Sequence, residues 1–211
     1  MTALFHGTTA SYAMPEGSAS VPLAGIVHVR LSATSAAKQF YALVNLVSAA
    51  AAWRLPSRGG AMLHAAGIVV DGRAFLLIGA EGAGKTTWAL RAREAGADVL
   101  SDDLVVVLPS PSGFDALGTP FRSAQHGTLA SGSWPLAALL LPEHGSFARL
   151  SPASGLATQT RLSANLPFVA EALPFDPRAA HVIEALAAAV PARILTFSPD
   201  PSFVPLLRTF P

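Results

Sequence analysis

The chain has 211 residues, which is enough for one substantial hydrophobic core but short for two full domains. It carries 14 Lys and Arg against 13 Asp and Glu, and the basic residues are scattered, so we expect no nucleic-acid partner. Cysteine is absent, which excludes disulfides and thiolate metal sites. The N-terminus lacks the basic start and apolar core of a secretion signal, so we expect a cytoplasmic protein.

Residues 1–60 predict a strand and a helix ahead of the rest of the domain. Residues 25–31 alternate between apolar and polar side chains, as in a strand with one buried face. Residues 1–20 look irregular, and we expect either an edge hairpin or a disordered segment there.

Residues 40–53 predict a buried helix, which begins near Thr34 or Ser35, where a hydroxyl can cap it, and ends before Pro56. The apolar side chains at helical spacing are Phe40, Leu43, Val44 and Val47. The stretch falls short of the roughly 20 apolar residues that span a bilayer, so we expect no membrane segment.

Residues 61–70 and 73–78 are apolar runs separated by Asp71 and Gly72, which predicts a β-hairpin. This hairpin would bring His64, in its first strand, close to the glycine-rich segment that follows the second strand. A lone histidine in an apolar strand is either a hydrogen-bonded core residue or a functional one, and both alternatives stay open at this point.

Residues 79–86 read Gly-Ala-Glu-Gly-Ala-Gly-Lys-Thr and fit the phosphate-binding pattern G-x-x-x-x-G-K-[ST] without a mismatch. Such a loop turns its backbone N–H groups inward through dihedrals that glycine adopts freely, and Gly79, Gly82 and Gly84 would supply this freedom. Lys85 would contact the outer phosphates, and the Thr86 hydroxyl would coordinate a magnesium ion. The expected nucleotide-binding residues are Gly79, Ala80, Glu81, Gly82, Ala83, Gly84, Lys85, Thr86 and Thr87. The alternative is a chance glycine-rich turn.

The segment that follows the loop supports this interpretation. Residues 86–95 predict a helix with Trp88, Ala89 and Ala92 on its apolar side. Gly96 stands where a left-handed helix stop is expected, and an apolar strand begins after it. Strand, glycine-rich loop, helix and strand follow in the order that a phosphate-binding loop requires.

The sequence Ser101-Asp102-Asp103 lies between two apolar pairs of residues. Adjacent ionised carboxylates in such a run need a cation, a proton or hydrogen-bond donors to hold them. A magnesium ion beside the phosphates would serve one aspartate and leave the other to accept a proton from an attacking hydroxyl. The alternative is an Asp-rich turn between two short strands.

The remaining residues predict further elements of an α/β domain. Residues 109–118 are rich in Pro, Ser and Gly and predict a surface loop, residues 134–141 a buried strand, and residues 150–173 helical pieces. Residues 177–190 predict a helix with Val182, Ile183, Leu186 and Val190 inward and His181 at the surface. The chain ends with a strand over residues 192–197 and a short helix near residues 202–208.

His64, the glycine-rich loop, Gly96 and the Asp102–Asp103 pair resemble, in order and spacing, the core of the HPr serine kinase/phosphorylase family. The close match covers residues 62–108. The resemblance implies that Lys85 holds the phosphates, Thr86 and Asp102 the magnesium ion, and that Asp103 acts as base toward a serine hydroxyl with His64 assisting. It also implies a mixed sheet, as in that family and in ATP-type phosphoenolpyruvate carboxykinases.

Residues 118–121 and 190–197 resemble small stand-alone HPr-kinase-like proteins, some of which accompany pathways for ribosomally made, modified peptides such as lasso peptides. A precursor peptide is therefore one expected acceptor. The chain differs from the bifunctional enzymes in having Glu81 where they have Ser, and in lacking the Glu-Arg-Gly segment that supports phosphorolysis. Arg122 is either the nearest arginine that could stabilise transferred charge or a solvated surface residue, and both alternatives stay open.

The sequence thus predicts an α/β fold, with one P-loop domain over residues 1–211 whose nucleotide-binding core is 61–108 and whose C-terminal part is 109–211. The expected activity is an ATP- and Mg²⁺-dependent kinase acting on a hydroxyl, most directly a serine, of a protein or peptide. A nucleotide hydrolase or switch, and a binding module without chemistry, remain alternatives. An assembly of identical subunits is compatible with the sequence.

Overall fold

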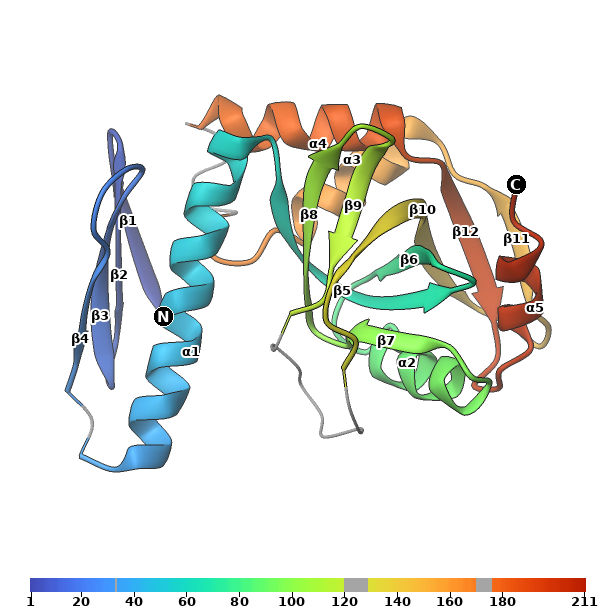
Figure 1. Cartoon of the computed structure of the whole chain (residues 1–211), viewed down its shortest axis with the longest axis horizontal. Helices are drawn as coiled ribbons and strands as arrows, with labels where there is room; N and C mark the ends of the chain where they lie inside the picture. The colour runs from blue at the N-terminus through green and yellow to red at the C-terminus, as the bar shows by residue number, and fades with distance from the viewer. Residues whose placement is uncertain (33, 120–128, 170–175) are drawn as a thin grey trace.

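The computed structural model describes residues 1–32, 34–119, 129–169 and 176–211 (Figure 1). The N-terminal elements are β1 (Thr2–His6), β2 (Thr9–Met14), β3 (Gly17–Pro22), β4 (His28–Leu31), α1 (Ala36–Arg54) and the 3-10 turn η1 (Leu55–Arg58). The four strands pair antiparallel in chain order and form a sheet of their own. Ser35 caps α1 as predicted, and its hydroxyl oxygen accepts a hydrogen bond from the Lys38 amide at 3.4 Å.

The structure of residues 1–20 differs from the irregular or disordered segment that was one expectation. These residues form regular strands, because small polar side chains such as Ser11 alternate with inward Ala10 and Tyr12. That alternation is weak in the sequence, since alanine and serine differ little in hydrophobicity. Of the predicted strand over residues 25–31, only His28–Leu31 pairs, and most of its residues are exposed.

The inward face predicted for α1 is wrong. Phe40 is 69% exposed, Leu43 41% and Val47 44%, although all three were expected in the core. The buried side chains are instead Ala42, Leu46, Ser48, Ala49, Ala50, Ala52 and Trp53. Helical spacing could not distinguish the two faces because both are apolar, and the alanines let the helix approach the N-terminal sheet closely.

The larger sheet has the order β11-β12-β10-β6-β5-β8-β9, with β7 also paired to β5. Its strands are β5 (Ala61–Val70), β6 (Arg73–Ile78), β7 (Asp98–Ser101), β8 (Leu104–Ser110), β9 (Gly113–Leu117), β10 (Ser133–His144), β11 (Arg149–Pro152) and β12 (Ala192–Phe197). β6, β10 and β12 are parallel to one another, and the other pairings are antiparallel. The sheet is therefore mixed, as predicted, in an α/β fold.

Two apolar layers cover this sheet, because successive residues of each strand point to opposite faces. Phe75 and Leu77 of β6 pack with α2 (Lys85–Glu94) and α5 (Phe203–Arg208), whereas Leu76 and Ile78 face the cluster that includes α3 (Gly155–Ala164) and α4 (Pro177–Ala189). The second cluster continues through Trp53 into the N-terminal sheet. The inward residues predicted for α2 and α4 are buried, and His181 is exposed.

Two downstream predictions need correction. Residues 109–118 are not a surface loop, because β8 continues to Ser110 and β9 begins at Gly113. The side chain of Phe114, in β9, is buried in the core. Residues 150–152 belong to β11 rather than to a helix, and α3 begins only after the Ser154 cap. Residues 170–173 lie outside the described part of the chain. No helix within the described ranges is long and apolar enough to cross a membrane.

Candidate functional site

The glycine-rich segment connects the end of β6 to the start of α2. Gly82 and Gly84 have φ of 77° and 88°, so both use the left-handed conformation that glycine adopts freely. Gly79 does not share that conformation, contrary to our expectation, and is required for a different reason. A Cβ at Gly79 would lie 2.7 Å from Pro142 Cγ and 2.8 Å from Ala83 Cβ, so the loop passes too close to β10 for any side chain.

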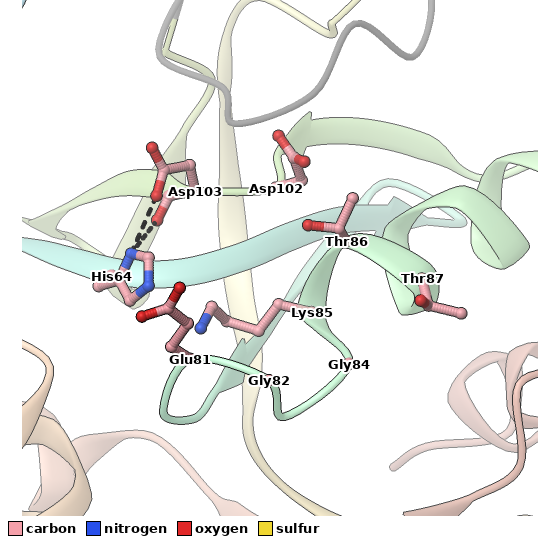
Figure 2. A pocket seen from close by; sticks show the side chains of 9 residues that line it. All are labelled: His64, Glu81, Gly82, Gly84, Lys85, Thr86, Thr87, Asp102 and Asp103. Carbon is pink, nitrogen blue, oxygen red and sulfur yellow. Dashed lines mark hydrogen bonds and ion pairs between the residues drawn. The ribbon is translucent and has the colours of Figure 1, made fainter.

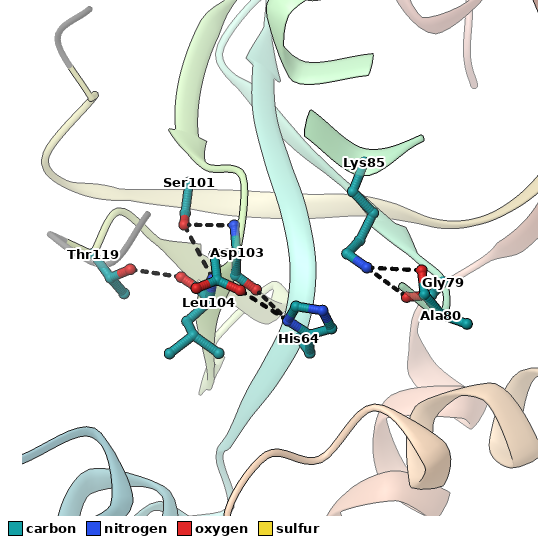
Figure 3. A network of polar contacts seen from close by, with 8 residues as sticks. All are labelled: His64, Gly79, Ala80, Lys85, Ser101, Asp103, Leu104 and Thr119. Atoms are coloured by element: carbon teal, nitrogen blue, oxygen red, sulfur yellow. Dashed lines mark hydrogen bonds and ion pairs between the residues drawn. The ribbon is translucent and has the colours of Figure 1, made fainter. Parts of the chain in front are cut away.

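Lys85 is the first residue of α2 and is only 6% exposed. Its ammonium donates hydrogen bonds to the carbonyl oxygens of Gly79 at 2.8 Å and Ala80 at 3.0 Å, which are shown in Figure 3. Burial lowers the pKa of Lys85 below the ordinary lysine value, and the negative charges of Asp103 and Glu81 oppose that shift. The loop therefore holds a desolvated cation against its own carbonyl oxygens.

The Asp102–Asp103 pair lies where the chain passes from β7 to β8. Ser101 pairs with Gly67 of β5, and Leu104 pairs with His64 of the same strand. Asp102 and Asp103 therefore lie opposite Ala65 and Ala66 of β5, next to His64. The Ser101 hydroxyl oxygen accepts hydrogen bonds from the Asp103 and Leu104 amides, both at 3.1 Å, and this turn fixes the aspartates.

The β5–β6 hairpin brings His64 close to the glycine-rich segment, as predicted. Ala65 pairs with Ile78, the last residue of β6, so His64 lies one residue beyond the end of that strand. Its backbone amide donates to the Asn165 carbonyl at 2.8 Å. Its ring Nδ1 lies 3.0 Å from Asp103 Oδ1, which makes the histidine a side-chain partner of the second aspartate and not a core residue.

These residues line one cavity of about 600 Å³, shown in Figure 2. Its walls are formed by His64, Glu81, Gly82, Gly84, Lys85, Thr86, Thr87, Asp102 and Asp103. Thr86 and Asp102 lie on one side of Lys85 in this view, and His64 and Asp103 on the other. Of the predicted nucleotide-binding residues, Gly79, Ala80 and Ala83 do not line the cavity, although the Gly79 and Ala80 carbonyls orient Lys85.

Thr86 and Asp102 provide a hydroxyl and a carboxylate on the same side of the cavity. Oxygen ligands of this kind suit Mg²⁺, which is commonly bound through one or two protein groups, with phosphate oxygens and water completing its octahedron. No group of three or more His, Asp or Glu able to hold a metal occurs among residues 1–32, 34–119, 129–169 and 176–211. Thr86 and Asp102 are thus the residues that could hold a magnesium ion together with phosphate oxygens.

Three residues of the site were given no role by the sequence. The Ser101 hydroxyl holds the backbone amides of Asp103 and Leu104, and a serine directly before a turn is a usable signal for this role. The Thr119 hydroxyl donates to the Leu104 carbonyl at 2.6 Å and supports the same turn, while Asn165 offers its carbonyl to His64. No local pattern indicates the last two contacts, because they join segments far apart in the chain. Arg122 lies outside the described residues.

Comparison of the chain with protein-family models and with curated protein sequences finds no match.

Proposed function

We propose that the chain is an ATP-dependent, Mg²⁺-requiring kinase that transfers the γ-phosphate to a hydroxyl, in the first place a serine of a protein or peptide. The observation that carries this proposal is the shared cavity, in which a glycine-rich loop with Lys85 and Thr86 faces Asp102 and the His64–Asp103 pair. The resemblance of residues 62–108 to the HPr serine kinase/phosphorylase family supports the same activity.

Each residue has a distinct part in this proposal. Lys85 and the N-terminus of α2 bind the phosphates, and Thr86 with Asp102 would hold the magnesium ion, which supplies neutralising charge when it is bound. Asp103 accepts the proton of the acceptor hydroxyl, and His64 orients its carboxylate. The hydroxyl oxygen forms a bond to the γ-phosphorus while the bond from that phosphorus to the β,γ-bridging oxygen breaks, and ADP leaves.

Other uses of the same cavity differ in their products. A hydrolase or nucleotide switch would use water in place of the acceptor and release free phosphate. A binding module would hold ATP without turnover, and a small-molecule kinase would place the phosphate on an acceptor that is not a peptide. The side-chain pairing of His64 with Asp103 favours a chemical step over binding alone, because neither residue is needed to hold a nucleotide.

The test is to incubate the full chain with Mg²⁺, γ-labelled ATP and an extract of peptides and proteins from its source cells, with Asp103→Asn as control. We expect label on a hydroxyl of one acceptor with the natural chain and none with the variant. Label found only as free phosphate would replace the kinase by a hydrolase. If the protein binds ATP but the label stays on ATP, the chain would be a binding module without phosphoryl transfer.

A further inference from the structure

Glu81 is a charged residue of the loop with no part in the proposed chemistry. Its side chain is exposed and lines the cavity. Its negative charge and that of Asp103 both oppose the lowering of the Lys85 pKa, so both carboxylates lie near the same ammonium. Figure 2 shows Glu81 on the side of the cavity where His64 and Asp103 lie, away from Thr86 and Asp102. Glu81 therefore belongs to the half in which an acceptor hydroxyl would meet the base.

The carboxylates of the cavity differ in the partners that they have. Asp103 is paired with His64 at 3.0 Å, and Asp102 is 6% exposed beside Thr86, at the expected metal position. Within the described ranges Glu81 has no hydrogen bond or ion pair, and Lys85 influences it only over a longer distance. Because Lys85 would contact phosphate in the proposed reaction, Glu81 is the carboxylate left to meet a charge brought by the acceptor.

We propose that Glu81 selects acceptors that carry a lysine or arginine next to the phosphorylated hydroxyl and disfavours acceptors with an acidic residue there. This inference rests on the proposed kinase function. An opposite charge beside Glu81 is attracted in a partly enclosed cavity, whereas a like charge is repelled by Glu81 and by the triphosphate together. Selectivity therefore arises from attraction and repulsion at the same residue.

The experiment uses the full chain, Mg²⁺, γ-labelled ATP and a pool of synthetic peptides, each with one serine and randomised neighbours. We expect labelled peptides to carry Lys or Arg next to serine about tenfold more often than Asp or Glu, since about 1.4 kcal/mol corresponds to tenfold. Glu81→Gln should abolish the preference, and Glu81→Lys should reverse it. The preference should also weaken at high salt, because screening acts on exposed charges.

Glu184→Lys is the matched control, because Glu184 is exposed on α4, does not line the cavity, and gives the same change in net charge. It should leave the preference unchanged. The inference would be overturned if Glu81→Lys and the natural chain labelled peptides with the same preference for flanking charges. Glu81 would then act only on Lys85. Absence of label on every peptide, with ATP still bound, would instead count against the proposed function.

Discussion

The Nδ1 atom of His64 lies 3.0 Å from Oδ1 of Asp103 and 3.1 Å from the Asp103 carbonyl oxygen. An N–H at Nδ1 can donate to either oxygen, and this leaves Nε2 on the side of Glu81 and Lys85 (Figure 2). The same Asp103 carbonyl accepts the Ala65 amide at 2.9 Å. The histidine thus joins the side chain and the backbone of Asp103, and the carboxylate has a fixed position at the cavity wall.

Asp103→Asn should retain ATP binding and lose phosphoryl transfer. The amide keeps the shape of the carboxylate but cannot accept the hydroxyl proton, and general base catalysis contributes about 10²- to 10⁴-fold to such rates. Single-turnover transfer with labelled ATP measures the loss, and equilibrium titration with ATP measures the binding.

Asp102→Asn separates the two aspartates. We expect its transfer rate to recover in part when the Mg²⁺ concentration is raised, because the change weakens a proposed metal ligand and leaves the base intact. The rate of Asp103→Asn should not respond to added Mg²⁺. The opposite pattern would exchange the roles of the two residues.

His64→Ala should reduce the transfer rate by about tenfold, which is less than the loss for Asp103→Asn, because it removes the group proposed to orient the base and not the proposed base itself. ATP affinity should be unchanged. His64→Asn should restore part of the rate, since its side-chain amide nitrogen can donate to Asp103 from the position of Nδ1. A rate for His64→Ala equal to that of the natural chain would assign this residue to the support of the strand alone.

As the pH rises, ATP affinity should begin to fall at a lower pH than the one at which an ordinary lysine loses its proton. Burial lowers the pKa of Lys85 from its usual value of 10.5, and phosphate contact requires the ammonium. Affinity is therefore full below the Lys85 pKa of the free protein and declines as the pH passes it, by at most about tenfold per pH unit.

Titration with ATP from about pH 7.5 to about pH 10 measures this decline, well above the ordinary pKa of histidine and the carboxylates. Lys85→Arg is the control, because the guanidinium stays charged over this range, and its weaker affinity should be flat with pH. An equal decline in both proteins would assign the pH dependence to another group.

The sequence signals that bring the site residues into one cavity are local. The turn at Asp71 and Gly72 places His64 beside the loop, and the short spacing from Gly96 to Asp103 brings the aspartates back to the same strand. Helix caps and stops such as Ser35 and Gly96 are also local, and both are confirmed. The mixed sheet came from resemblance, since periodicity carries no information on strand direction.

Features that depend on distant contacts were not predictable in the same way. Phe40 is exposed and Ala49 buried because α1 packs on the N-terminal sheet, and the sequence does not indicate which apolar face will be covered. The hairpin of β8 and β9 was predicted as a loop because residues 109–118 contain many turn-forming Pro, Ser and Gly residues. The alternation of apolar and polar side chains around Phe114 is too short to indicate a strand. The role of Gly79 likewise depends on Pro142, which lies in a strand much further along the chain.

Gly79→Ala should weaken ATP binding at least tenfold and lower the free energy of unfolding by about 1–3 kcal/mol, the usual cost of overpacking. The new Cβ would lie 2.7 Å from Pro142 Cγ, and Pro142 is paired within β10 to Leu195 of β12, so the loop must move instead. Gly155→Ala is the matched control, because a Cβ there meets nothing within 4 Å, and it should leave stability unchanged or slightly raised. Denaturant unfolding and ATP titration of both variants measure these effects. If Gly79→Ala bound ATP and unfolded like the natural chain, the close approach of the loop to β10 would not be what holds the phosphate-binding backbone in place.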